Sequence, residues 1–161
     1  MKSRLPPASW VKPESQHLTL AFLGEHDESA VEKLAPAVER AVNGVKKFEA
    51  RLKDCGFFPN PRHARVGWVG VMPEDAFRQV ANAVRGALKE TGVAFDEKEF
   101  RPHLTMMRIR DPWPPACIET FHSALRGHES APFTVERVTL FSSKLGSDGA
   151  VHTPIREFRL A

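Results

Sequence analysis

The sequence predicts an α+β fold in which helices and antiparallel strands alternate along the chain. Apolar residues recur at helical spacing in two long stretches, residues 27–42 and 73–90. Around these stretches lie short β-favouring segments joined by turn sequences, which indicate hairpins rather than the crossovers of a parallel sheet. At 161 residues, the chain can bury a sizeable core in one domain or in two closely packed lobes.

The N-terminal segment contains one predicted strand. Residues 2–16 hold three prolines and only a short apolar patch at Trp10 and Val11, which indicates a loop with a few extended residues. A buried strand is predicted over residues 16–23, where β-favouring apolar residues continue as far as Gly24.

The first predicted helix covers residues 27–42. Asp27 or Ser29 can serve as its N-cap, and Asn43-Gly44 can end it. Pro36 should kink this helix or shift its first turn, because proline lacks the backbone N–H. The apolar stripe consists of Val31, Leu34, Val38 and Val42.

A hairpin and a second helix come next. Strands are predicted over residues 48–57 and 64–71, with the sequence PNPR as the turn between them. The helix over residues 73–90 has the clearest pattern, and Gly92 is its expected end. Its apolar stripe consists of Phe77, Val80, Ala81, Val84 and Leu88.

The second half repeats this layout loosely. A short extended piece at residues 93–95 leads to a predicted strand over residues 102–109, and DPWPP breaks the chain after it. Strands over residues 133–142 and 150–160 are joined by the turn sequence GSDG. A weaker helical pattern lies between, carried by Ile118, Phe121 and Leu125. Two similar lobes facing each other would make residues 1–161 a single bilobal domain with a central cleft.

Composition narrows the class of protein. Hydrophobic residues make up 42% and charged residues 27%, as in an ordinary globular protein, and no apolar run approaches the ~20 residues that span a bilayer. No signal-peptide pattern follows the N-terminus, so we expect a cytoplasmic location. Cys55 and Cys117 are expected to be reduced structural thiols. A net charge of +3 permits a phosphate-bearing partner without indicating a nucleic-acid footprint.

Two short motifs carry the chemistry: His17-Leu18-Thr19 and His103-Leu104-Thr105. In an extended strand each His and its Thr lie on one face, because side chains alternate. Two histidines can divide the roles of general acid and general base. Thr19 and Thr105 can donate hydrogen bonds to the non-bridging oxygens of a phosphate. The pattern therefore suits the opening of a cyclic phosphodiester without a metal or another cofactor.

Other interpretations of the histidines remain. A single His-x-Thr occurs by chance, but two copies with apolar continuations favour catalysis. A metal site is disfavoured because no Cys or carboxylate stands at ligand spacing. His152 can line the cleft at best, since Thr153 follows it directly and points to the other face. The remaining histidines are expected at the surface: His26, His63, His122 and His128.

Several residues are candidates for contact with RNA. Arg62, Arg65, Arg108 and Arg110 could bind phosphates or could simply be solvated surface charges. Arg108 stands at an odd offset from His103, so it can serve only if the strand ends or bulges there. The aromatic candidates for stacking on a base, most of them expected in the core, are Phe22, Phe57, Phe58 and Trp68.

Four stretches together resemble the two-histidine (2H) phosphoesterases: HLTLAFLGE, FFPNPRHARVGWVGV, RPHLTMMR and VERVTLFSSKLGSDGAVHTPI. The similarity extends from about Trp10 to the C-terminus and is greatest to the RNA 2′,3′-cyclic phosphodiesterases, often labelled 2′-5′ RNA ligases. It implies a bilobal α+β fold with pseudo-two-fold lobes, antiparallel sheets and outer helices. It further implies His17 as proton donor and His103 as proton acceptor.

The resemblance also implies a substrate and no metal or cofactor. The substrate would be an RNA end with a 2′,3′-cyclic phosphate, or a small cyclic nucleotide, hydrolysed to a 2′-phosphomonoester. Separately, we expect the protein to be a monomer. Reverse 2′-5′ ligation and a non-catalytic binding module using the same cleft are the alternatives. Members of this branch usually begin with an apolar strand and a helix ahead of the segment matching Trp10. We therefore expect either an internal recorded start or a first lobe that lacks these two elements and exposes a sheet edge.

Overall fold

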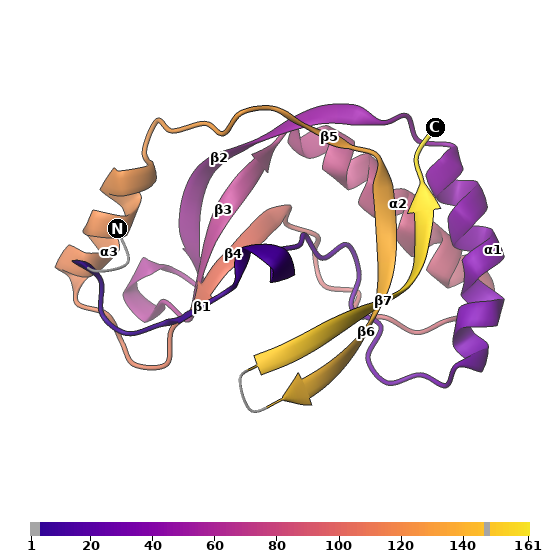
Figure 1. Cartoon of the computed structure of the whole chain (residues 1–161), viewed down its shortest axis with the longest axis horizontal. Helices are drawn as coiled ribbons and strands as arrows, with labels where there is room; N and C mark the ends of the chain where they lie inside the picture. Colours follow the sequence, from indigo (N-terminus) through magenta and orange to yellow (C-terminus); the bar gives the residue numbers. More distant parts are fainter. Residues whose placement is uncertain (1–3, 147–148) are drawn as a thin grey trace. The chain divides into compact units, whose positions relative to one another are not determined.

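The computed structural model describes residues 4–146 and 149–161, and within these ranges the chain adopts the predicted α+β fold (Figure 1). The chain divides into two compact units. Unit 1 contains the chain up to Thr19, Ala50–Glu74 and Arg101–Pro132, and unit 2 contains Leu20–Glu49, Asp75–Phe100 and Phe133–Ala161. In chain order the elements are β1 (Ser9–Trp10), η2 (Pro13–Ser15), α1 (Ser29–Asn43), β2 (Phe48–Phe58), η3 (Pro61–His63), β3 (Val66–Met72), α2 (Glu74–Thr91), β4 (His103–Arg108), α3 (Pro115–Leu125), β5 (Phe133–Val135), β6 (Arg137–Gly146) and β7 (Gly149–Arg159).

Unit 1 is built on an antiparallel sheet with β4 between β1 and β3 (Figure 1). The full strand order of the sheet is β1-β4-β3-β2-β5, of which β5 and the first two residues of β2 belong to unit 2. β2 and β3 form the predicted hairpin, and the PNPR turn contains the helical turn η3. One face of the sheet packs against α3, where Phe57, Met107 and Phe121 are 4%, 0% and 0% exposed. The pattern through Ile118, Phe121 and Leu125 is therefore a helix, as predicted.

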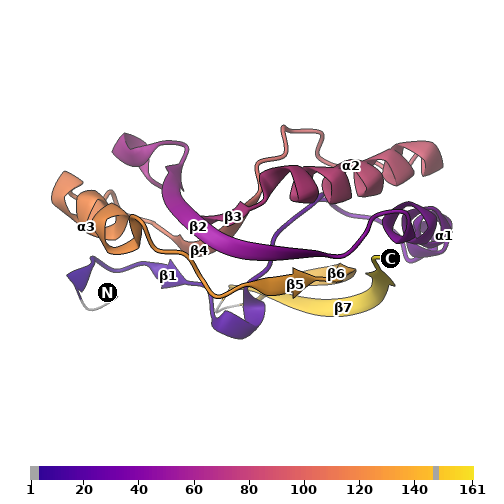
Figure 2. The same cartoon turned by 90° about the horizontal axis from the view of Figure 1, so that it is seen from above.

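Unit 2 packs α1 and α2 together and places α1 against β7 (Figure 2). All five residues of the predicted α2 stripe are buried (Phe77, Val80, Ala81, Val84 and Leu88), and Val80, Val84 and Leu88 belong to this core. In α1, Pro36 lies inside the helix, while the neighbouring Ala35 and Ala37 are buried. The hairpin of β6 and β7 is antiparallel throughout its register. The tip residues Ser147 and Asp148 of the predicted GSDG turn lie outside the described residues.

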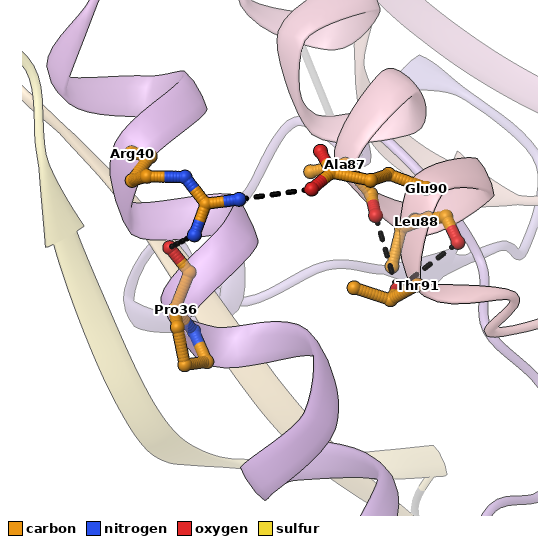
Figure 3. Close-up of polar contacts among 6 residues, drawn as sticks. All are labelled: Pro36, Arg40, Ala87, Leu88, Glu90 and Thr91. Carbon is orange, nitrogen blue, oxygen red and sulfur yellow. Dashed lines mark hydrogen bonds and ion pairs between the residues drawn. The ribbon is translucent and has the colours of Figure 1, made fainter.

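The end of α2 shows why its boundary was predictable. Gly92 has φ of 66°, the left-handed conformation that glycine adopts without strain. Its N–H donates to Lys89 O, and the next N–H, of Val93, donates to Leu88 O, which closes a Schellman motif. Thr91 Oγ1 donates to the carbonyls of Ala87 and Leu88 at 3.0 and 3.1 Å (Figure 3). The carbonyls of Ala87, Leu88 and Lys89 in the last turns of the helix are thereby hydrogen-bonded.

Near the same end, Arg40 of α1 forms an ion pair with Glu90 of α2 at 2.9 Å and donates to Pro36 O (Figure 3). Both side chains are more than 60% exposed (65% and 63%), so this pair contributes little stability compared with the buried apolar contacts. Packing of the two apolar stripes is therefore what holds α1 and α2 together.

The predicted strand over residues 16–23 is wrong. No helix or strand is assigned between Gln16 and Glu28, because a strand needs a hydrogen-bonded ladder and both sides of β4 are taken by β1 and β3. Apolar character still buries part of the segment, since Leu20, Ala21 and Leu23 pack against the unit 2 core. Phe22, expected inside, is 65% exposed.

Several smaller expectations also differ from the structure. The N-cap of α1 is Glu28, which makes no side-chain cap bond, rather than Asp27 or Ser29. The predicted strand over residues 133–142 is divided into β5 and β6 at Glu136. The extended piece at residues 93–95 has no helix or strand assigned to it, which does not conflict with the prediction, and its Val93 is buried among the helices of unit 2.

Candidate active site

Both histidine motifs lie in unit 1. His103 and Thr105 open β4, where they pair with Gly70 and Trp68 of β3. Because they are two residues apart in a strand, they share one face of the sheet. His17 and Thr19 follow the helical turn η2. His103 and Thr105 are half-buried, whereas His17 and Thr19 are exposed.

Backbone pairing holds the His17 segment beside β4. Ser9 and Trp10 pair with Arg108 and Met107, and Val11 N donates to Met106 O at 2.9 Å. After η2, Gln16 Nε2 lies 3.9 Å from Met106 Sδ. The residue immediately before His17 therefore contacts the strand that carries His103, and the two motifs belong to one structural neighbourhood.

The two imidazoles are held by the same backbone contact. Nδ1 of His17 lies 2.9 Å from Ser15 O, and Nδ1 of His103 lies 2.6 Å from Arg101 O. Each carbonyl belongs to the residue two positions earlier. A carbonyl oxygen only accepts hydrogen bonds, so Nδ1 donates in both cases. Nε2 is then the nitrogen that can give or take a proton in each motif.

Aromatic side chains surround His103 on the same face of the sheet. The rings of Phe58 and Trp68 are stacked with centroids 5.3 Å apart. The His103 ring lies 4.9 Å from Phe58 and 6.4 Å from Trp68, edge-on to both. Phe57 points to the other face and is buried against α3. Of the stacking candidates, Phe58 and Trp68 lie at the site, Phe57 belongs to the core, and Phe22 belongs to unit 2.

A β-bulge decides where Arg108 points. Gly67 pairs with Met107 while Trp68 pairs with Thr105, so Met106 is an extra residue in β4. Counting through this bulge returns Arg108 to the face of His103 and Thr105. Arg108 could contact RNA only if the strand ended or bulged near it, and the bulge at Met106 meets this condition. The Arg108 side chain is exposed.

The remaining arginine candidates lie around the turn between β2 and β3. Arg62 and Arg65 are exposed. Asn60 Oδ1 accepts from the backbone N–H of Arg62 and so fixes the start of η3. The guanidinium of Arg65 donates to Arg110 O, which places Arg65 next to the end of β4.

The other histidines separate into different surroundings. His63 and His128 are exposed, as predicted. His26 is exposed too, and its Nε2 lies 2.9 Å from Ala94 O. The expectation for His122 is wrong, because its ring is half-buried against Phe57 and its Nδ1 lies 4.0 Å from Cys55 Sγ. His152 belongs to unit 2, where its Nδ1 lies 2.7 Å from Ser143 Oγ.

Cys55 does not have the setting of a nucleophile. Cys55 and Cys117 are free and half-buried. Burial, followed by the charge of Asp54, raises the pKa of the Cys55 thiol, which keeps it protonated at neutral pH. Within residues 4–146 and 149–161, no three His, Cys, Asp or Glu side chains gather as metal ligands. None of the helices in those ranges has the length and apolar character to cross a bilayer.

Fold and paired motifs together define a two-histidine phosphoesterase. A model of the 2′-5′ RNA ligase superfamily matches residues 6–146, and the chain belongs to this family. It is 32% identical over 155 residues to an RNA 2′,3′-cyclic phosphodiesterase of Thermotoga maritima, covering 93% of this chain and 78% of that protein. The corresponding Methanothermobacter thermautotrophicus protein is 29% identical over 160 residues, covering 99% and 86%.

Solved structures agree with the fold. A protein of Thermus thermophilus superimposes with a TM-score of 0.76 at 28% identity, covering 94% of this chain and 81% of that one. E. coli LigT in complex with 3′-AMP superimposes with a TM-score of 0.72, covering 99% and 86%. At 24% identity, the LigT likeness establishes the fold alone.

Proposed function

We propose that this chain hydrolyses RNA 2′,3′-cyclic phosphate ends to 2′-phosphomonoesters, with His17 and His103 as its proton-transfer groups. Family membership supports the reaction class. The observation that carries the assignment is the matched bond from Nδ1 to a carbonyl in both motifs. It supports the proposal because it leaves Nε2 of each imidazole available for proton transfer. The other histidines of the described chain do not combine such a bond with a threonine two residues on.

The proposed reaction needs two proton transfers. Nε2 of His103 removes a proton from water as the water oxygen attacks phosphorus. The bond from phosphorus to O3′ breaks in line, and Nε2–H of His17 protonates the departing O3′. Thr19 and Thr105 donate hydrogen bonds to the non-bridging oxygens, which gain charge in the transition state. The product keeps its phosphate on O2′.

The protein's own residues can carry out both proton transfers of this scheme, since His103 takes the proton from water and His17 gives one to O3′, so we propose that no metal or cofactor takes part. Arg62, Arg65 and Arg108 would hold the phosphates of the RNA strand leading to the reacting end. If the attacking group is a 5′-hydroxyl instead of water, the same two transfers form a 2′-5′ linkage. We also propose a cytoplasmic monomer, which size-exclusion chromatography with light scattering and cell fractionation would test.

Turnover of adenosine 2′,3′-cyclic phosphate in excess EDTA tests the proposal. His17→Ala and His103→Ala should each lower kcat by on the order of 10²-fold or more, since each removes a proton-transfer group. His128→Ala, at an exposed histidine of the same unit, is the matched control and should keep full activity. The wild-type product should be adenosine 2′-phosphate. Full activity in either motif variant, or loss of activity on chelation, would overturn the mechanism.

A non-catalytic module that binds RNA ends is the competing function. It predicts that the cyclic nucleotide binds with an affinity that falls as salt rises, yet stays intact after long incubation. Chromatography of the bound nucleotide separates the two functions, because only the enzyme converts it.

A further inference from the structure

The face of the sheet beside His103 carries an aromatic surface made by Phe58 and Trp68. The two rings are stacked, and each lies edge-on to the imidazole of His103. Both side chains are half-buried rather than enclosed, so part of each ring faces outward. The opposite face of the same sheet holds the buried core with Phe57 and Phe121. Phe58 and Trp68 are therefore apolar residues on the face that carries the motif.

Gly56 makes room for this surface. A Cβ on Gly56 would lie under 3.0 Å from three atoms of the Trp68 indole, so the ring can lie flat over β2 only because this position lacks a side chain. Trp68 thus spans from β3 across β2, where Phe58 stacks on it. The arrangement fixes two large flat rings next to the imidazole of His103, a placement that core packing alone does not require.

We propose that Phe58 and Trp68 form the surface on which the base of the reacting nucleotide stacks. This inference rests on the proposed function and specifies its substrate class as cyclic phosphates that carry a nucleobase. A base attached to the ribose whose 2′,3′-cyclic phosphate meets His103 lies within a few ångströms of the phosphate, and the aromatic surface begins at the same imidazole. Stacking on aromatic rings is the usual way in which proteins hold unpaired bases.

The same surface has little means to read which base is present. The indole N–H of this surface, Trp68 Nε1, is enclosed by protein and has no hydrogen-bond partner in the described chain, so it does not reach a base edge. Stacking without such contacts tolerates all four bases, because each has a flat π face. The enzyme should therefore require a base and discriminate poorly among bases.

A base-free substrate separates stacking from simple support of the His103 ring. The probes are adenosine and uridine 2′,3′-cyclic phosphates and the 2′,3′-cyclic phosphate of 1-O-methyl-ribofuranoside. Wild-type kcat/KM should be roughly tenfold or more higher for both nucleosides, and Phe58→Leu should remove most of that preference. In that variant, turnover of the base-free probe should fall by a smaller factor than turnover of the two nucleoside substrates. Phe58→Tyr should retain the preference, and Phe133→Leu, at a 40% exposed Phe of unit 2, should leave all three rates unchanged.

Equal losses on all three probes in Phe58→Leu would mean that the ring only supports His103, and would overturn the proposal. Equal wild-type rates for substrates with and without a base would also overturn the stacking proposal, although the proposed hydrolytic function would remain supported. If no probe is turned over, the proposed hydrolytic function is wrong, but the stacking proposal can still be tested. Isothermal titration calorimetry then measures the binding of the product nucleotide and of its base-free analogue. Adenosine 2′-phosphate should then bind more tightly than the base-free 2-phosphate in the wild type but not in Phe58→Leu; equal affinities in the wild type would overturn the proposal.

Discussion

At the scale of single residues, the candidate site is a pair of similarly held imidazoles. In each motif the carbonyl two residues earlier accepts from Nδ1, so the chain between that carbonyl and the ring must fold back locally. Before His17 the turn η2 does this, and before His103 the buried Pro102 precedes the strand. Proline restricts the residue before it to extended conformations. The short sequences Ser-Gln-His and Arg-Pro-His thus reach the same contact by different means.

Thr105 allows a test of the phosphate-binding role. Thr105→Val keeps the shape and the β-propensity of the side chain but removes the hydroxyl donor, so kcat should fall by roughly 10²-fold with a smaller change in KM. Steady-state kinetics on a cyclic nucleotide measures this. Thr120→Val, which removes an exposed hydroxyl bonded to Ala116 O in α3, is the matched control. An unchanged kcat in Thr105→Val would remove Thr105 from the mechanism.

Arg108 tests whether the bulge matters for RNA binding. Arg108→Gln should weaken binding of a single-stranded oligonucleotide and reduce the slope of log K against log salt by about 0.7, the value for one phosphate contact. Fluorescence anisotropy at several salt concentrations gives both quantities. Arg159→Gln, at an exposed arginine of β7, should leave the slope unaltered. Equal slopes for wild type and Arg108→Gln would place Arg108 outside the RNA path.

At the scale of elements, β4 organises the site. Its first residues carry one motif, its middle contains the bulge, and its pairing with β1 brings the chain to the other motif. The register is well determined, because the buried Met107 must face the core formed with α3. A shift by one residue would exchange Met107 with a neighbour on the outer face, so core packing also fixes the direction of His103 and Thr105.

Two glycine positions give opposite expectations for the same substitution. Gly56→Ala forces the Trp68 indole to move, so it should lower the free energy of unfolding by about 1–3 kcal/mol. Gly86 lies in α2 with open space around its Cβ position, so Gly86→Ala should raise that free energy by about 0.5–1 kcal/mol. Urea unfolding followed by tryptophan fluorescence measures both. Stabilisation by Gly56→Ala would contradict the packing of Trp68 over β2.

At the scale of the whole molecule, carboxylates in both units predict loss of stability in acid. The pKa of Glu129 is lowered by its hydrogen bond and ion pair with Lys53, at 2.6 Å. The pKa of Glu119 is lowered by Ser123 and then Arg126. In unit 2, hydrogen bonds from Lys98 lower the pKa of Asp96. A lowered folded-state pKa stabilises the protein above the unfolded-state value, and this stabilisation is lost as pH falls.

The expected result is a urea midpoint that declines below about pH 4, where carboxylates of the unfolded chain take up protons. Glu129→Gln should lower the midpoint at pH 7 slightly and flatten the acid decline. The exposed Glu25→Gln is the comparison variant. A midpoint constant down to about pH 3 would show that these pairs contribute nothing to stability, as is true of many exposed ion pairs.

Much of the fold could be predicted because neighbouring residues encode it. The apolar stripe of α2 and the glycine at its end determine a helix whatever surrounds it, and the turn between β2 and β3 is marked by its own prolines and Asn60. The prediction of a strand over residues 16–23 was wrong because strand formation depends on residues that are distant in the sequence. Its composition favours β structure, but a strand exists only where a partner backbone is free, and composition carries no information about partners.

By itself, the sequence determined which residues carry the candidate chemistry: two histidines and two threonines at a spacing that shares a face in extended chain. Only the tertiary structure decided that both motifs lie in unit 1, that a bulge at Met106 returns Arg108 to the face of His103, and that Phe58 and Trp68 adjoin that imidazole. The physical reason is the separation along the sequence of the residues that interact. Spacing within a motif is set by adjacent peptide units, whereas register, bulges and ring contacts are set by strands distant in sequence that must bury the same core.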